Sequence, residues 1–164
     1  MRRHDATRGP HEAAMKIDAQ PLLVPGLHRL TLEEIKVLTV EAFPGSTKRA
    51  DLFGRFLAWR AQLKALGLSG CVWLDGSFMT AKESPNDIDL IMWSPTIDGS
   101  LTLEQEAQAD LLFDNPTCKA VYGLDVYLAV PKPDRVIHDE AYWKGMFGFC
   151  HDRVTAKGIA EVLV

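Results

Sequence analysis

The sequence has 164 residues, a net charge of −4, 47% hydrophobic residues and 24% charged residues. This composition is typical of a water-soluble globular protein, and the length predicts one domain. No apolar run reaches the roughly 20 residues that a membrane-spanning helix needs, so we expect no membrane partner. The acidic net charge excludes a basic surface spread over the whole protein, although a local basic patch stays possible.

The three cysteines, Cys71, Cys118 and Cys150, are odd in number and form no C-x-x-C pair. This pattern predicts free thiols in a reducing cytoplasm rather than a disulfide framework or a zinc site. Residues 1–20 are polar and lack any period, so we expect a disordered arm before a single domain over residues 21–164. Met15 is a second possible start of translation.

Two capping-box patterns predict where helices begin. The pattern Thr31–Glu34 predicts a helix that reaches about Ala42, and Thr102–Gln105 predicts one that reaches about Phe113. Asn115-Pro116 is expected to end the latter. A longer helix is expected from Ser46 or Thr47 to Gly67, because its apolar residues recur at helical spacing.

Strands are expected over Gly70–Leu74, Ile88–Trp93 and Ala120–Val130, and the segment Lys157–Val164 predicts a closing strand. A short helix is expected over Asp139–Phe147. The fold class is therefore α/β (α+β): a small mixed, partly antiparallel sheet with two or three helices on one face and an open site on the other. Arg49 and the other basic residues of the long helix are expected on its solvent-exposed face.

Asp87 and Asp89 are one residue apart at the start of an apolar strand. Side chains alternate faces along a strand, so both carboxylates are expected on one face, with Ile88 and Leu90 on the other. Adjacent carboxylates repel, and a divalent cation such as Mg²⁺ relieves that repulsion. The alternative is a pair of solvated aspartates at the mouth of a strand.

Gly76-Ser77 follows the preceding apolar strand. A glycine at this place lets the backbone turn and approach a ligand, and successive N–H groups with a serine hydroxyl can bind a phosphate. An ordinary turn is the alternative explanation.

Gly76-Ser77, separated by nine residues from Asp87-Ile88-Asp89, resembles the signature of the DNA polymerase β-like nucleotidyltransferases. The similarity extends over about Leu68 to Val130 and is closest to their small stand-alone bacterial members, the minimal nucleotidyltransferases. That family adds a third carboxylate on a later strand, and Asp125 is the candidate. The alternative is a lone strand aspartate that pairs with a nearby Lys or Arg. One departure is Asp75, where the family more often has an apolar or small residue. The sequence leaves open whether Asp75 is a further ligand, a substrate contact or a local cap.

The resemblance implies an enzyme that uses Mg²⁺ (or Mn²⁺) to move an NMP from an NTP, with ATP expected, to an acceptor such as tRNA or a protein. It assigns the metal ions to Asp87, Asp89 and Asp125, and the phosphates to Gly76 and Ser77. Arg153 and Lys157 either reach the triphosphate or are surface charges. Small bacterial relatives often belong to toxin–antitoxin or phage-defence systems, so that biology is an expectation of the resemblance as well.

Three alternatives stay open from the sequence. The first is a non-catalytic, antitoxin-like module that binds a nucleotide or a partner protein. The second is a D-x-D glycosyltransferase, which usually needs a longer chain, and the third is a generic α/β domain with solvated aspartates. The acceptor, the choice of NTP and the oligomeric state are not fixed by the sequence.

Overall fold

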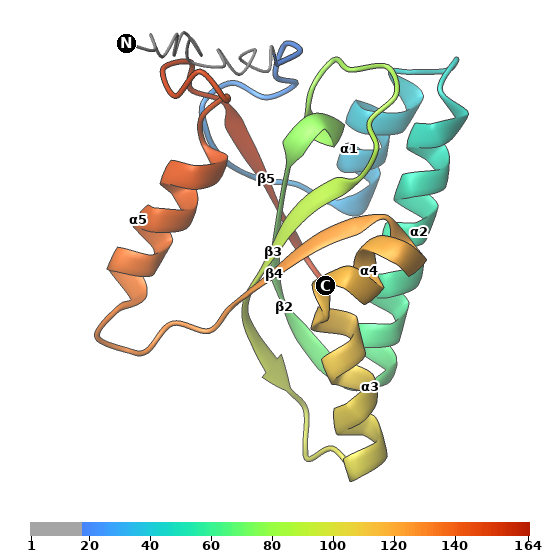
Figure 1. Cartoon of the computed structure of the whole chain (residues 1–164), viewed down its shortest axis with the longest axis vertical. Coiled ribbons are helices and arrows are strands. Elements are labelled where there is room, and N and C mark those ends of the chain that lie inside the picture. The colour runs from blue at the N-terminus through green and yellow to red at the C-terminus, as the bar shows by residue number, and fades with distance from the viewer. Residues whose placement is uncertain (1–17) are drawn as a thin grey trace, which may run out of the picture.

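The computed structural model describes residues 18–164, so most of the expected N-terminal arm, including Met15, lies outside the described residues. Within this range the chain forms five α-helices and one open five-stranded mixed sheet (Figure 1), which confirms the predicted fold class. The strands are β1 (Gly26–Arg29), β2 (Leu68–Asp75), β3 (Ile88–Ile97), β4 (Leu124–Ala129) and β5 (Gly158–Leu163). The α-helices are α1 (Leu32–Lys36), α2 (Thr47–Ala65), α3 (Leu103–Phe113), α4 (Asn115–Tyr122) and α5 (Val136–Phe147). None of these helices is long and apolar enough to span a membrane.

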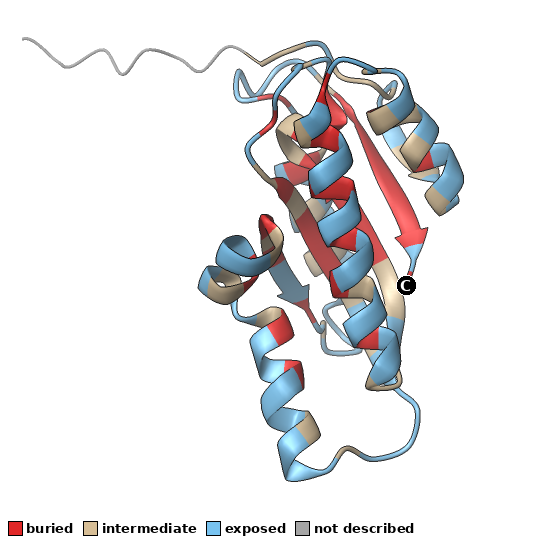
Figure 2. Ribbon diagram, turned by 90° about the vertical axis from the view of Figure 1, so that its right-hand side faces the viewer, coloured by how far each residue is buried: buried red, intermediate tan, exposed pale blue. Residues whose placement is uncertain are grey.

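The strands lie in the order β1-β5-β2-β3-β4. Strand β2 is antiparallel to both β3 and β5, whereas β1 pairs with β5 and β3 pairs with β4 in parallel. Parallel neighbours need a crossover connection, and α3 with α4 supplies it between β3 and β4. Strand β5 is buried over most of its length (Figure 2), because it lies inside the sheet.

The two faces of the sheet are covered unequally. Side chains such as Val72, Leu90 and Val126 face the main core, which also contains residues of α1, α2, α3 and α4. On the other face, Trp73 and Ile91 form a smaller core with Phe147 of α5. Four helices therefore cover one face rather than the expected two or three, and α5 covers part of the face that was expected to be open (Figure 1).

Local signals place the helix ends correctly. The Thr31 and Thr102 side chains each accept a hydrogen bond in a complete capping box. Ser46 caps the N-terminus of α2, and Gly67 follows that helix with φ of +72°. The first helix continues into a π-helical turn, Val37–Glu41, and the helical segment ends there.

The expected strand over Ala120–Val130 is wrong in its first part. Residues Asn115–Tyr122 form helix α4, and the strand begins only at Leu124. The Asp114 side chain accepts a hydrogen bond from the Thr117 N–H, so Asn115-Pro116 opens a helix instead of ending one. Gly123 closes α4 with φ of +67°. Strand β1 was not expected, and α5 begins three residues before the predicted Asp139.

Candidate functional site

Three aspartates lie in one row across three neighbouring strands. Asp75 is the register partner of Asp89 in the β2–β3 pair, and Asp89 is the register partner of Asp125 in the β3–β4 pair. Register partners present their side chains on the same face, here the face that also carries α5. Directly opposed residues of antiparallel strands have Cα atoms about 4.5–5.5 Å apart, so the row is narrow. It therefore concentrates negative charge at one end of the sheet.

Asp89 lies in the middle of this row. Burial, and after it the nearby carboxylates of Asp87, Asp125 and Asp75, raise the pKa of its carboxyl from 3.8 to about 6. Among the described residues, neither a salt bridge nor a side-chain hydrogen bond connects Asp89 to a cation. Its charge is the one in the row that no cationic side chain contacts.

Asp125 and Asp87 share one lysine of α4. Lys119 Nζ lies 2.9 Å from Asp125 Oδ2 and 3.1 Å from Asp87 Oδ2. Asn115 Nδ2 donates a second hydrogen bond to Asp125 Oδ1 at 2.6 Å. Burial raises the pKa of Asp125, but the hydrogen bonds from Asn115 and Lys119 outweigh that effect and lower it overall. The hydrogen bonds of Lys119 with Asp125 and Asp87 raise the pKa of Lys119. The ammonium group therefore bridges two of the predicted metal ligands.

Asp75 pairs with Lys157 at the other end of the row. Lys157 Nζ lies 2.9 Å from Asp75 Oδ2, and both side chains are less than a tenth exposed. Burial raises the pKa of Asp75, and the ammonium group of Lys157, followed by the backbone N–H of Gly76, opposes this shift. Asp75 Oδ1 is buried and has no hydrogen-bond partner among the described residues.

The glycine turn and the aspartate pair are in direct contact. Gly76 begins a 3₁₀ turn, Gly76–Met79, with φ of +71°. A Cβ atom built at this position would overlap the Asp89 carboxylate. Only glycine satisfies both the left-handed backbone and the close approach. Ser77 lies at the start of this turn and is half-buried, and its carbonyl accepts a hydrogen bond from Thr80 Oγ1.

Arg49 of α2 supports the connection that follows this turn. Its guanidinium is fully buried and donates hydrogen bonds to backbone carbonyls of Thr39, Phe78, Thr80 and Lys82. It also lies 3.9 Å from the centre of the Phe43 ring. The expectation that Arg49 is solvent-exposed is therefore wrong. The irregular connection after Gly76 has buried backbone carbonyl groups, and Arg49 supplies their hydrogen-bond donor.

The structure brings most of the predicted site residues together. Gly76 contacts Asp89, Lys119 links Asp87 to Asp125, and Lys157 joins the row through Asp75. Asp87 lies just before β3, so the alternation of side chains along that strand does not set its position. Its connection to Asp125 is the shared contact with Lys119. Arg153 is exposed in a turn with φ of +60° and makes no salt bridge to the described aspartates.

Sequence reasoning missed three of the residues that complete this site. Lys119 and Asn115 lie in a segment whose helical character was not recognised, although Asp114-Asn115-Pro116-Thr117 is a helix-start pattern. Arg49 gave no such signal, because a basic residue in an amphipathic helix usually faces solvent.

The donor atoms of the row suit a hard cation, because Mg²⁺ and Mn²⁺ favour carboxylate oxygens. Across residues 18–164, however, no group of three or more His, Cys, Asp or Glu side chains has the arrangement of a metal site. In this structure the ammonium group of Lys119 lies within hydrogen-bonding distance of both Asp87 and Asp125. The residue chemistry fits a divalent ion, and Lys119 has to move for Asp87 and Asp125 to bind one.

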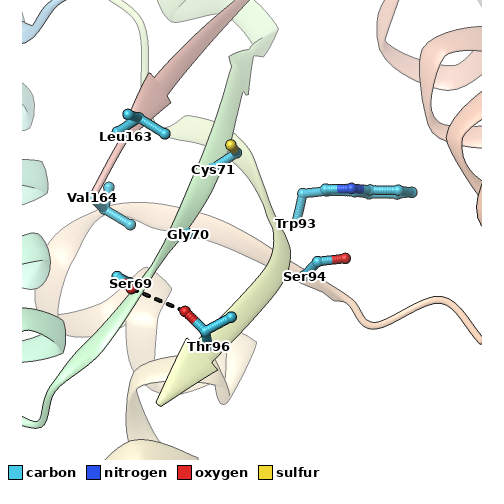
Figure 3. A pocket seen from close by; sticks show the side chains of 8 residues that line it. All are labelled: Ser69, Gly70, Cys71, Trp93, Ser94, Thr96, Leu163 and Val164. Atoms are coloured by element: carbon cyan, nitrogen blue, oxygen red, sulfur yellow. Dashed lines mark hydrogen bonds between the residues drawn. The ribbon is translucent and has the colours of Figure 1, made fainter. Parts of the chain in front are cut away.

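A separate cavity of about 380 Å³ lies at the opposite end of the same strands (Figure 3). Its lining comes from β2, β3, β5 and the C-terminal residue, and includes Ser69, Cys71, Trp93 and Leu163. No charged side chain lines this cavity. Its lining has hydroxyl groups and the Cys71 thiol but no carboxylate side chain and no basic side chain, so the aspartate row remains the candidate site for metal and phosphate chemistry.

Comparison with known proteins gives a family without an assigned activity. No curated protein and no solved structure matches the chain. A family profile described as "Family of unknown function (DUF6932)" matches residues 15–163, which include the whole aspartate row and both of its lysines. The chain therefore belongs to this family of unknown function, DUF6932.

Proposed function

We propose that this protein is a Mg²⁺- or Mn²⁺-dependent nucleotidyltransferase that moves an NMP from an NTP, with ATP as the expected donor, to an RNA or protein acceptor. The observation that carries the proposal is the row of Asp75, Asp89 and Asp125, together with the close contact between Gly76 and the carboxylate of Asp89. A phosphate-binding turn and a carboxylate cluster in contact are the two parts that nucleotidyl transfer requires. The resemblance to the polymerase β-like enzymes supports the same assignment.

Each residue then has a defined task. Asp87, Asp89 and Asp125 would hold the metal ions, which supply charge neutralisation at the α-phosphate and the leaving pyrophosphate. The N–H groups of the Gly76-Ser77 turn and the Ser77 hydroxyl bind phosphate oxygens of the NTP. Asp125 would also accept the proton of the attacking hydroxyl group, because an aspartate carboxylate is ionised at neutral pH.

The lysines balance the charge of the site. Lys119 is about half exposed, so its side chain can leave Asp87 and Asp125 and bind a phosphate of the incoming nucleotide instead. Lys157 and Arg153 are the other cations assigned to the triphosphate. Lys157 contacts Asp75 of the row, so it contributes positive electrostatic potential around the phosphates rather than a direct contact with them.

The acceptor is expected to be an RNA such as tRNA, or a partner protein, in the cytoplasm. A toxin–antitoxin or phage-defence system is the setting that the family resemblance suggests. The three free cysteines agree with a reducing compartment.

A non-catalytic, antitoxin-like module is the second candidate. It is favoured by one observation, the Lys119 ammonium group that already neutralises Asp87 and Asp125. A binding module that needs no metal would keep this arrangement permanently.

A labelling assay separates the two candidates. The purified chain is incubated with Mg²⁺ and each α-labelled NTP, with total tRNA and cell lysate as acceptors. Asp87→Ala and Asp89→Ala are the site variants, and Asp51→Ala, an exposed aspartate of α2, is the matched control. Transfer that persists in Asp51→Ala and disappears in the site variants is expected. NTP binding without transfer, and without a need for Mg²⁺, supports the binding module, and equal transfer in all variants contradicts the proposed site.

A further inference from the structure

Asp75 has an oxygen atom whose environment is incomplete. Its side chain is 6% exposed, and Lys157 contacts Oδ2 but not Oδ1. Oδ1 has no hydrogen-bond partner among residues 18–164. A buried carboxylate oxygen without a partner is unfavourable, and such atoms commonly mark the place of an ion or a water molecule.

The position of Asp75 shows which ligand would complete it. Asp75 lies directly opposite Asp89 on the same face, and the next residue is the glycine that contacts Asp89. Asp89 is the aspartate of the row that no lysine contacts. Two carboxylates side by side, one without a cation and one with an unpaired oxygen, are the kind of donors that a cation with oxygen ligands favours.

We propose that Asp75 is a further ligand of the divalent cation bound at Asp89, and that Lys157 holds Asp75 Oδ2 so that Oδ1 stays free for the ion. The inference rests on the proposed function for the presence of that ion. The nucleotidyltransferase pattern does not assign a metal-binding role to this position, because the family more often has an apolar or small residue there. Lys157 then acts as a positioning residue, since its buried ammonium group fixes the carboxylate and offsets one negative charge of the row.

The test measures metal binding rather than turnover. Binding of Mn²⁺ to the full chain is followed by the electron paramagnetic resonance signal of free Mn²⁺, with and without ATP, near pH 7.5. Asp75→Asn keeps the shape of the side chain but removes its charge, and is expected to weaken Mn²⁺ binding by about tenfold or more. Asp51→Asn, in the exposed ion pair with Arg55, is the control and should bind as the wild type does.

A second variant identifies a ligand directly. Asp75→Cys replaces a hard oxygen donor with a soft sulfur donor, so the preference for Cd²⁺ over Mn²⁺ should rise by about tenfold or more relative to the wild type. A purely structural Asp75–Lys157 pair would change the thermal stability of this variant but not its metal preference. This measurement decides the question if Asp75→Asn does not fold.

The outcomes separate this inference from the proposed function. Mn²⁺ binding that is lost in Asp87→Asn but unchanged in Asp75→Asn overturns the role of Asp75 and leaves the nucleotidyltransferase proposal in place. A wild-type chain that binds no Mn²⁺, even with ATP, overturns both.

Discussion

Gly76 lies directly against the carboxylate of Asp89, so closely that a Cβ atom at Gly76 would overlap it. The turn at the end of β2 and the paired aspartates at the start of β3 are thus one packed unit. A change on either side of this contact displaces the other side.

Gly76→Ala tests this contact. Alanine adds the overlapping atom and also disfavours φ of +71°, a backbone cost of about 1–3 kcal/mol. We expect a lower free energy of unfolding in urea and loss of nucleotidyl transfer. Gly54→Ala is the matched control, because Gly54 is exposed in α2 and a Cβ atom added there would meet nothing within 4 Å. That control should gain about 0.5–1 kcal/mol. Equal effects of both variants would contradict the close-contact explanation.

Lys119→Met tests whether the ammonium group competes with the metal. Removing it leaves Asp87 and Asp125 without their shared cation, so the metal-free protein should be less stable. Mn²⁺ binding in the absence of nucleotide should become tighter by about tenfold, because binding no longer displaces the lysine. Isothermal titration calorimetry measures the affinity, with Lys64→Met as an exposed control on α2. Unchanged or weaker Mn²⁺ binding would show that Lys119 does not occupy the cation position.

The raised pKa of Asp89 predicts a specific dependence of stability on pH. In the folded protein this carboxyl titrates near 6, above its usual 3.8, so the native state retains a proton that the unfolded chain releases. The contribution of Asp89 to stability is therefore greatest at low pH and decreases as the pH rises from about 4 to 6. The shift of about two units corresponds to about 3 kcal/mol.

Asp89→Asn provides the reference for that measurement. Urea unfolding with EDTA, between about pH 4 and pH 7, should show the wild type losing stability relative to the variant as the pH rises. A constant difference between the two proteins across this range would contradict the raised pKa. The site also loses affinity for a metal below about pH 6, since protonation of Asp89 competes with the ion.

Arg49→Met tests the support of the connection after Gly76. The variant leaves several buried carbonyl groups without a donor, and we expect a loss of about 3 kcal/mol or more. Arg55→Met is the control, because Arg55 forms only an exposed pair with Asp51 and should change stability by less than about 0.5 kcal/mol. Chemical denaturation of both variants gives the comparison. Similar small losses would show that the Arg49 hydrogen bonds contribute little.

Strand alternation was enough to predict part of the site. Asp89 and Asp125 each lie in an apolar strand, and alternation places their carboxylates on the face opposite Leu90 and Val126. Once β3 and β4 are neighbours, the carboxylates of Asp89 and Asp125 come to lie side by side. The capping boxes likewise gave the starts of two helices, because a cap depends only on residues three apart.

Contacts between distant segments could not be predicted in this way. Lys119 reaches Asp87 only because α4 packs against β4, the parallel neighbour of β3, and Lys157 reaches Asp75 only because β5 pairs with β2. Arg49 donates to the carbonyl of Phe78, which lies 29 residues further along the chain. Such pairings depend on the tertiary arrangement, which local patterns do not encode.

The place of β5 inside the sheet has a consequence for synthesis on the ribosome. This strand emerges after the four others, yet it lies between β1 and β2 and pairs with both. Until residues 158–163 leave the exit tunnel, the edges of β1 and β2 that pair with β5 stay open, and Asp75 has no Lys157 beside it. We expect the nascent chain to need protection from aggregation during this interval and to form the Asp75–Lys157 pair only in a late step.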